Sequence, residues 1–471
     1  MAMFQTAAHT VQTKIGHQKK AHNPFQRFNI DIETVLLNAE GRPTKEVYEE
    51  ARDRFETPGC CLIVKFHLEG EAADADPMLK LGITMYLRSV MEACVISAGS
   101  KDVNDRATLI KYDDERAFLF HENANVALRA ACKANLVAQY SNEFLSREKG
   151  VQITVTCGLE VGNLLLLVGD YFGDAVNVAS KLGEDHAEPG QILMSIPCHE
   201  TIQEQEPELL SLLNVEDGFV KISGVEIHYK SISMNDSVAQ SVLPQSTLPD
   251  CATLVSNTNN AVRRVCLQML QPNGGLSQVH LSTIQEHKEV VTMLQSDMSG
   301  FTRLTKKYGI LHFLTLVVHC RRIFKECLPP NHGSIVKYDG DNVIAKFPSP
   351  YHCLGAVKAI QAAIDQFNMG KKKDYQIRIK LGVSHGEVLI VGHDIVGESW
   401  EDCCALGEDT AEVGEILLTE EVHEALVNGG YNDSLKCNFE PRKVKGEHGS
   451  LKHFNVTFPA DNWSTAYYYF I

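Results

Sequence analysis

The chain has 471 residues, of which 44% are hydrophobic and 22% charged, and its formal net charge is −16. These values are typical of a soluble globular protein with two or three domains, and the acidic balance argues against binding to nucleic acid. No apolar run approaches the roughly 18 residues of a membrane-spanning helix, and the N-terminus lacks the apolar core of a secretory signal. We therefore expect a cytoplasmic protein without a transmembrane segment, whose 14 cysteines are reduced and mostly buried.

Two long segments of the chain repeat one another. The stretch KYDDERAFLF at 111–120 matches KYDGDNVIAKF at 337–347, and TCGLEVGNLLLLVGD at 156–170 matches KLGVSHGEVLIVGHD at 380–394. Because the order and spacing agree over whole domains, the sequence predicts a duplicated domain and not a solenoid of short units. In chain order we expect an N-terminal extension (1–55), a first domain (56–233), a linker (234–285), a second domain (286–460) and a tail (461–471).

The linker is recognised by its composition. Residues 234–260 are rich in Ser, Thr, Asn, Gln and Pro, and they show neither helical nor strand periodicity. In the second domain, a β-rich run at 290–294 is followed by an apolar stripe from Phe313 to Cys327 that is typical of an amphipathic helix. Two β-like runs then flank Asp339-Gly340, a pair that favours a tight hairpin turn. Two further elements follow, a helix at 353–367 and a strand at 377–383. We expect each domain to be an α+β unit with helices on one face of a sheet.

One frame occurs in both domains with different polar contents. Residues 170–185 and 394–409 share D-x-x-G, eight residues, and then L-G-E-D. The first copy carries Asn177 and Lys181, where the second copy has Glu401 and Ala405. The two domains are therefore expected to differ in chemistry while sharing a fold.

Two carboxylates of the second domain are candidates for binding divalent cations. Asp297 follows the strand at 290–294, and the residues after it, Ser-Gly-Phe-Thr, lead into a helix whose backbone N–H groups suit phosphate oxygens. Asp341 lies at the tip of the Asp-Gly hairpin. A strand end and a neighbouring hairpin could place both carboxylates around a pair of metal ions.

In this order, DMSGFT at 297–302, KYDGD at 337–341 and DYFGDAVNVASK at 170–181 resemble the signature of class III nucleotidyl cyclases. The resemblance extends over both repeats. It implies two ferredoxin-like α+β catalytic domains that pair head to tail within one chain, as a monomeric pseudo-heterodimer. In this family one domain supplies the metal ligands and its partner supplies the groups that bind the nucleoside.

The resemblance assigns the metal-binding role to the second domain. Its ligands would be the Asp297 and Asp341 carboxylates and the backbone carbonyl of Met298, around two Mg²⁺ or Mn²⁺ ions. The backbone N–H groups of Phe301 and Thr302 would contact the triphosphate.

The first domain would supply the complementary set. The resemblance implies that Lys111 and Asp170 read the base, Asn177 orients the ribose, and Lys181 stands where the family usually has a transition-state Arg. Lys221 resembles a lysine that contacts the triphosphate. Lysine retains the positive charge of arginine but loses its planar bidentate fork, so we expect slow turnover.

The reciprocal site has lost these groups. Its metal positions carry His67 and Glu115, Asp114 replaces the hairpin glycine, and Glu401 and Ala405 occupy the transition-state positions. A polyphosphate would be repelled by Glu401. This degenerate pocket could instead hold a small regulatory molecule, as in the tandem cyclases that this chain resembles.

The leading hypothesis is an adenylyl cyclase that converts ATP to cyclic AMP and pyrophosphate at one composite site. Lys111 can donate to adenine N1 and Asp170 can accept from N6, whereas guanine reverses this pattern, so a guanylyl cyclase is disfavoured. The second hypothesis, ahead of the guanylyl cyclase, is a regulatory or structural pseudo-cyclase that binds a nucleotide without turning it over. The replacement of Arg by Lys181 and the broken reciprocal site favour it, whereas Asp297, Asp341 and Asn177 together oppose it.

Overall fold

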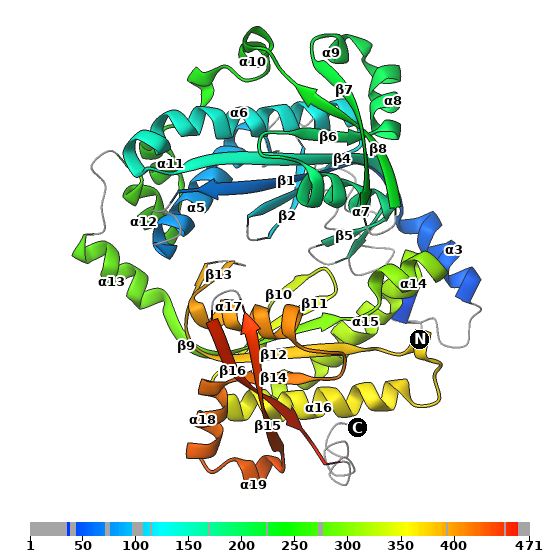
Figure 1. The fold of residues 1–471 in the computed structure, drawn as a ribbon, viewed down its shortest axis with the longest axis vertical. Coiled ribbons are helices and arrows are strands. Elements are labelled where there is room, and N and C mark those ends of the chain that lie inside the picture. The colour runs from blue at the N-terminus through cyan, green and yellow to red at the C-terminus, as the bar shows by residue number, and fades with distance from the viewer. Residues whose placement is uncertain are drawn as a thin grey trace, which may run out of the picture.

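The structure, a computed structural model, describes residues 35–37, 44–70, 76–96, 107–113, 115–167, 170–222, 225–271, 277–391, 394–446 and 449–459. Within these ranges the chain forms two eight-stranded sheets, one from each repeat, which lie one above the other in Figure 1. The mixed α+β architecture and the duplication are as the sequence predicts. No helix in these ranges combines the length and apolar character needed to cross a bilayer. All 14 cysteines are free, and 11 of them are buried.

The two sheets have the same topology. The first has the strand order β2-β3-β1-β4-β6-β8-β7, and the second has the order β10-β11-β9-β12-β14-β16-β15. The strands of the first sheet are β1 (Thr57–Glu69), β2 (Thr108–Asp113), β3 (Arg116–His121), β4 (Gln152–Leu167), β5 (Asp170–Phe172), β6 (Ile192–Ser195), β7 (Asn214–Ile222) and β8 (Val225–Ser233). Those of the second are β9 (Lys288–Met298), β10 (Ser334–Asp339), β11 (Asn342–Phe347), β12 (Ile379–Val391), β13 (Asp394–Val396), β14 (Ile416–Thr419), β15 (Asn438–Gly446) and β16 (Gly449–Thr457). β5 and β13 pair only with β4 and β12, and so form short arms.

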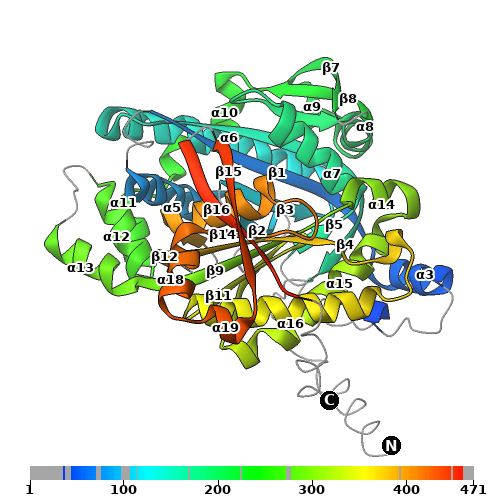
Figure 2. The ribbon, with the colours of Figure 1, turned by 60° about the horizontal axis from the view of Figure 1, so that its bottom comes forward.

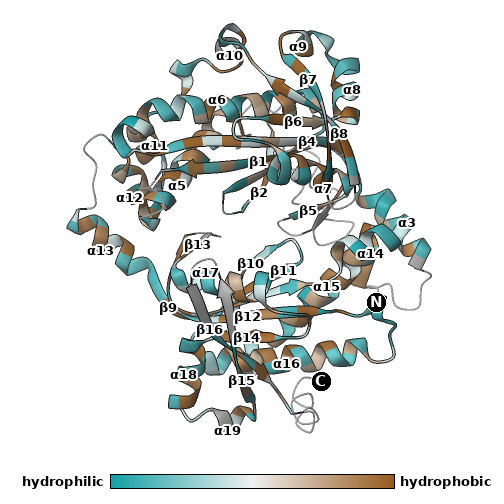
Figure 3. Ribbon diagram, in the orientation of Figure 1, coloured by the Kyte–Doolittle hydropathy of each residue, from teal (hydrophilic) through white to brown (hydrophobic). Residues whose placement is uncertain are grey.

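Helices cover both faces of each sheet, which corrects the expectation of helices on one face. In the first repeat α5 (Pro77–Cys94) and α6 (Ala124–Lys149) bury one face, and in the second α15 (Ile310–Cys327) and α16 (Pro350–Asn368) do so. Two short helices, α7 (Asp174–Ser180) and α17 (Glu398–Cys404), pack on the opposite faces, and each continues into a π-helical turn. Figure 3 shows apolar residues along the strands and the inner sides of the long helices, with polar residues on their outer sides. The remaining helices within the repeats are α8 (Ile196–Gln205), α9 (Pro207–Ser211), α14 (Phe301–Tyr308), α18 (Glu420–Asn428) and α19 (Asn432–Leu435).

The linker is helical where it is described, although its sequence shows no helical period. It forms α10 (Asp236–Val242), α11 (Cys251–Asn257), α12 (Ala261–Met269) and α13 (Gln278–His287). Each helix has seven to ten residues, too few turns for a clear apolar stripe. The signal that was available is the capping residue, because Asn235, Asp250, Asn260 and Ser277 each accept a hydrogen bond at a helix N-terminus.

Each repeat is held against the other by the segment that precedes its first strand. Val47, Ala51 and Phe55 of α3 (Thr44–Phe55), which leads into β1, join the apolar core of the second repeat. Val262 and Val265 of α12, which precedes β9, pack with α5 of the first repeat. Figure 2 shows α3 beside α14 and α15, and α12 beside α5.

The arms add to this exchange in the same pattern. Leu165 and Phe172, from the β4–β5 arm, enter the core of the second repeat, and Leu389 and Val391 of β12 pack with α5. The repeats therefore pair head to tail within one chain.

Candidate active site at the junction of the two repeats

A hairpin in the second repeat brings two carboxylates together. β10 and β11 pair through Asp339 and Asn342, and Gly340 takes the positive φ of 57° that the tight turn requires. Asp341, the other turn residue, lies near Asp297 at the end of β9. Burial and, after it, the charge of Asp297 raise the pKa of Asp341 to about 7, against opposing contributions from the Met298 N–H and Arg321.

The two carboxylates fit a divalent cation. A buried carboxylate that faces a second carboxylate is favoured by a cation, which offsets the cost of burial and the repulsion between the two charges. No group of three or more His, Cys, Asp or Glu in the described ranges could hold a metal on its own. Mg²⁺ commonly uses one or two carboxylates and completes its shell with water and substrate phosphates, so Asp297 and Asp341 suffice. The carbonyl of Met298 stays a predicted ligand.

A lysine that the sequence reasoning missed lies beside this pair. Lys380 is directly opposite Asp297 in the β9–β12 ladder, and its Nζ lies 2.8 Å from Asp297 Oδ2. The signal was present, since the alternation at 377–383 places Lys380 on a strand next to β9. Its ammonium adds positive charge where a polyphosphate would approach.

The start of α14 is suited to phosphate contacts. Gly300, with φ 105°, is the N-cap, and no side chain caps the helix. The Phe301 ring packs on Phe313 with 5.1 Å between centroids, whereas Thr302 is exposed. The first backbone N–H groups of α14 therefore lie at an uncapped helix start, one turn beyond Asp297 in sequence.

The two predicted base-reading residues of the first repeat meet at the same hairpin. Lys111 Nζ lies 3.0 Å from Asp170 Oδ2 and 2.6 Å from Asp339 Oδ1. The backbone N–H of Gly340 donates to Asp170 Oδ2 over 2.5 Å. Burial opposes the charge on Lys111, but Asp170 and Asp339 outweigh it and raise the pKa of Lys111 above its ordinary value. The base-reading pair thus contacts the hairpin that carries Asp341.

Asn177 and Lys181 lie one helical turn apart, at the end of α7 and the start of its π-helical turn (Lys181–His186). Both are half-buried, and the backbone N–H of Lys181 donates to the carbonyl of Asn177. α7 lies on the side of the first sheet that faces the second repeat (Figure 1). No side-chain hydrogen bond or ion pair of the described residues joins either side chain to Asp297 or Asp341.

The shared frame has a structural cause. A Cβ on Gly158 of β4 would lie 2.0 Å from the Ala179 carbonyl oxygen and 2.6 Å from the Gly183 nitrogen. In the second repeat a Cβ on Gly382 would lie 2.4 Å from the Cys403 carbonyl oxygen. Gly183 and Gly407, the glycines of L-G-E-D, face these strand residues, so a glycine on each side lets the helical turn press onto the strand. The polar residues elsewhere in the frame are free to differ.

The glutamate of the frame also has one role in both repeats. Glu184 accepts a hydrogen bond from Arg116 at 2.8 Å, and Glu408 accepts one from Asn342 at 2.8 Å. Arg116 and Asn342 are the first residues of β3 and β11, so each glutamate ties the π-helical turn to the neighbouring hairpin. The glutamate of L-G-E-D thus has the same structural role in both repeats.

Lys221 is not brought to these residues by any contact. It lies on β7 opposite Glu226 and is exposed, and residues 223–224 that follow this strand lie outside the described residues. Its proposed role at the triphosphate therefore stays a prediction.

The reciprocal site is filled by different contacts. The strand register corrects the placement of His67: Ala117 pairs with Val64 as Val343 pairs with Ser296, so Lys65 and not His67 is equivalent to Asp297. His67 Nε2 lies 3.0 Å from Thr156 Oγ1, and Glu115 forms an ion pair with Lys80 at 2.8 Å. Asp114 lies outside the described residues. A cavity of about 480 Å³ opens here between the repeats, and its lining includes Leu81, Glu115, Trp400, Glu401 and Ala405. Lys80 thus places an ammonium group beside Glu115, the counterpart of Asp341.

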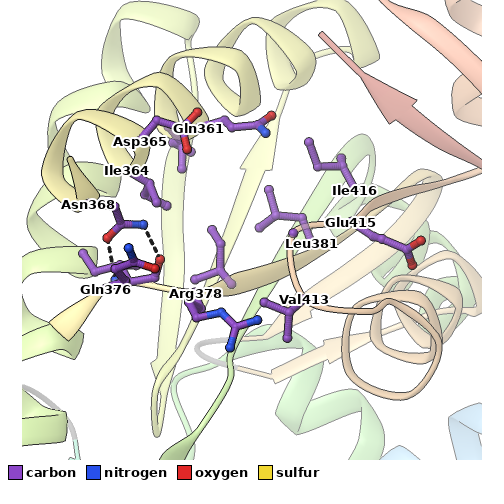
Figure 4. Close-up of a pocket in the computed structure, with 14 residues that line it drawn as sticks. Gln361, Ile364, Asp365, Asn368, Gln376, Arg378, Leu381, Val413, Glu415 and Ile416 are labelled. Atoms are coloured by element: carbon purple, nitrogen blue, oxygen red, sulfur yellow. Dashed lines mark hydrogen bonds between the residues drawn. The ribbon is translucent and has the colours of Figure 1, made fainter. Parts of the chain in front are cut away.

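A second cavity, of about 270 Å³, lies away from the junction between α16 and β12 (Figure 4). Ile364, Leu381 and Ile416 form its apolar part, and Asn368 is bound to the backbone of Ile377. Gln361, Asp365 and Arg378 lie around it without converging on one point in Figure 4. This cavity therefore has no arrangement of groups for catalysis.

Comparison with known proteins gives a consistent picture. No protein-family model matches the chain. A protein from Rhizobium meliloti named "Putative adenylate cyclase 3" is 21% identical over 154 residues, which are 31% of this chain and only 26% of that relative.

Solved cyclase structures also align with the chain. An adenylate/guanylate cyclase/hydrolase from Silicibacter pomeroyi is 23% identical, with a TM-score of 0.31, over 37% of this chain and 98% of its own. A class III adenylyl cyclase-like ATP-binding protein from Pseudomonas aeruginosa is 12% identical, with a TM-score of 0.43, over 79% of this chain and 85% of its own. The ordered motifs, the duplicated sheet and the similarity to the Rhizobium protein agree with the resemblance of the sequence to class III nucleotidyl cyclases.

Proposed function

We propose that the chain is an adenylyl cyclase with one composite site at the junction of its repeats. The observation that carries this proposal is the β10–β11 turn, where Asp341 lies near Asp297 while the adjacent Gly340 N–H binds Asp170 of the other repeat. The groups proposed to bind metal and those proposed to read the base therefore meet within two consecutive residues. Because both sets belong to one chain, the site needs no second copy.

The proposed reaction is attack of the ribose 3′-oxygen of ATP on the α-phosphorus, with release of pyrophosphate. Asp297 and Asp341 would hold two Mg²⁺ or Mn²⁺ ions, which when bound supply Lewis-acid stabilisation of the attacking and leaving oxygens. The N–H groups of Phe301 and Thr302, with Lys380, would bind the triphosphate.

The first repeat would orient the nucleoside for this attack. Asn177 would hold the ribose, and Lys181 would stabilise negative charge on the α-phosphoryl group. Burial of the junction strengthens such charge interactions because water is excluded.

Base choice is proposed to rest on hydrogen-bond polarity. An ammonium such as Lys111 has three N–H groups, of which Asp170 and Asp339 take two, so one remains for adenine N1. Asp170 can accept from adenine N6, whereas guanine presents a donor at N1 and an acceptor at O6. A guanylyl cyclase is therefore the less favoured alternative.

A nucleotide-binding protein without turnover is the second candidate function. The observation in its favour is Lys181. Its ammonium group replaces the planar, bidentate guanidinium of the arginine that the family usually has at this position. Asp297, Asp341 and Asn177, which are all present in one composite set, together oppose this reading.

The reciprocal cavity is proposed to hold a small regulator in place of a second substrate. Lys80 pairs with Glu115, the counterpart of Asp341, and Glu401 faces the cavity with a charge that opposes phosphate. Leu81 and Trp400 offer apolar surface. An uncharged, partly apolar molecule suits this lining.

The test is cyclic AMP production by the purified chain with ATP and Mn²⁺, with the variants Asp297→Asn and Glu289→Gln alongside. Glu289 lies at the other end of β9, in an exposed ion pair with Lys346, and is the matched control. Product from the wild type and from Glu289→Gln, but not from Asp297→Asn, would support the proposal. Bound ATP without product under Mn²⁺ or Mg²⁺ would favour the binding function, and cyclic GMP from GTP would favour the guanylyl cyclase.

A further inference from the structure

Three consecutive residues of the β10–β11 hairpin contact both halves of the proposed site. The Asp339 carboxylate binds Lys111 at 2.6 Å, the Gly340 N–H binds Asp170 at 2.5 Å, and Asp341 lies near Asp297. The turn is closed by the pairing of Asp339 with Asn342, so only Gly340 and Asp341 lie between the paired residues. A shift of Asp339 is therefore transmitted to Asp341.

Lys111 is held tightly at this point. Its side chain is 12% exposed, and its Nζ lies 4.6 Å from the centroid of the Phe118 ring as well as against Asp170 and Asp339. Asp339 is the contact that comes from the other repeat. The position of the Lys111 ammonium is thus set jointly by the first repeat and by the hairpin of the second.

We propose that Asp339 is a positioning residue that couples base recognition in the first repeat to cation binding in the second. This inference rests on the proposed function of the site. An adenine that binds Lys111 and Asp170 fixes both side chains in place. Lys111 contacts Asp339, and Asp170 contacts the Gly340 N–H. The hairpin is then ordered with Asp341 facing Asp297, and the cation binds to a site that is already formed.

Adenosine separates this coupling from direct contact between metal and phosphate. It carries the base and the ribose but has no phosphate that could bind a cation. The 3′-hydroxyl is the one group of adenosine proposed to contact a metal ion, so 3′-deoxyadenosine is measured beside it. If both nucleosides change the affinity for Mn²⁺, the effect must pass through the protein. By linkage, Mn²⁺ must then change the affinity for adenosine by the same factor.

The experiment measures Mn²⁺ binding by calorimetry, with and without saturating adenosine, for the wild type, Asp339→Asn and Glu289→Gln. We expect adenosine to tighten Mn²⁺ binding about fivefold or more in the wild type and in Glu289→Gln, within the usual range of coupling between sites. In Asp339→Asn the factor should fall to about one, while Mn²⁺ alone still binds. Asp339→Glu, which keeps the charge, should recover part of the coupling.

Asparagine is close to aspartate in shape, and thermal unfolding will show whether the variant folds. If it does not, Asp339→Ser removes the same charge with a smaller side chain and replaces it in the comparison. Undiminished coupling in the folded charge-free variant overturns the inference, as does the absence of coupling in a wild type that binds adenosine and Mn²⁺ separately. A wild type that binds neither ATP nor adenosine overturns the proposed function as well, so the two failures are distinguishable.

Discussion

Lys337 Nζ lies 3.4 Å from Asp113 Oδ1 across the junction of the repeats, and this pair mirrors the one between Lys111 and Asp339. The two lysines come from equivalent strands, β2 and β10, and each binds an aspartate of the other repeat. Asp113 and Asp339 also share a hydrogen bond. The pairing of the repeats therefore has two reciprocal ion pairs around a carboxyl pair.

This arrangement predicts a pH dependence of stability. Burial and Asp339 raise the pKa of Asp113 to about 7, although Arg116 and Lys337 oppose the shift. Between about pH 4 and pH 7 the folded chain then holds a proton on Asp113 that the unfolded chain has lost, so the contribution of this group to stability declines as the pH rises through that window. In Asp113→Asn this loss is absent. Denaturant unfolding should show the variant gaining stability relative to the wild type from pH 5 to pH 8, and a difference that is flat or declines would contradict the assignment.

Lys181 should contribute to the rate more than to binding. Lys181→Ala removes the cation proposed to stabilise the α-phosphoryl group, so kcat for cyclic AMP should fall by about 10²–10³ with a smaller change in KM. Lys181→Arg restores a bidentate donor and should raise kcat above that of the wild type. Steady-state kinetics with Mn²⁺-ATP checks both, and equal losses in the Ala and Arg variants would argue against a phosphoryl contact.

Gly158 of β4 and Gly382 of β12, which the two frames pack against, provide a matched pair for separating fold from chemistry. Gly158→Ala would press on Ala179 of α7, which carries Asn177, whereas Gly382→Ala would press on Cys403 of α17. Overpacking of this kind costs about 1–3 kcal/mol of unfolding free energy, and we expect similar losses in the two variants. Activity per folded molecule should fall sharply only in Gly158→Ala. Equal activity losses would mean that both helices serve the site.

The linker helix α12 should stabilise the pairing of the repeats. Leu267 has no exposed surface and lies in the core of the first repeat, while Arg264 on the same helix is exposed. Leu267→Ala should lower the unfolding free energy by about 2–5 kcal/mol. Arg264→Ala should change it by less than about 0.5 kcal/mol. Denaturant titration followed by circular dichroism measures both values, and a linker that is only a tether would leave Leu267→Ala as stable as the control.

The sequence by itself determined the duplication, the α+β class and the division of polar residues between the repeats. These features are local. The Asp339-Gly340 turn, the apolar stripe of α15 and the strand around Lys380 are encoded within a few residues, and the repeated motifs can be compared without knowing where they lie. The linker helices were missed because each is too short for a period, although their caps were in the sequence.

Only the tertiary structure decided which of these residues meet. Lys111 and Asp339 are 228 positions apart, and their contact depends on how two domains pack and not on any spacing in the chain. The same holds for the contact of Lys380 with Asp297. It also holds for the contact of Lys80 with Glu115, where an ammonium group lies beside the residue that corresponds to Asp341. The need for glycine at Gly158 and Gly382 also arises from the tertiary structure. A Cβ at either position would clash with the backbone of a helix that lies elsewhere in the sequence. Turns, helices and strands depend on residues that are close together in the sequence. Charge pairing across the junction instead depends on burial, because buried charges need partners, and burial arises only when the domains pack.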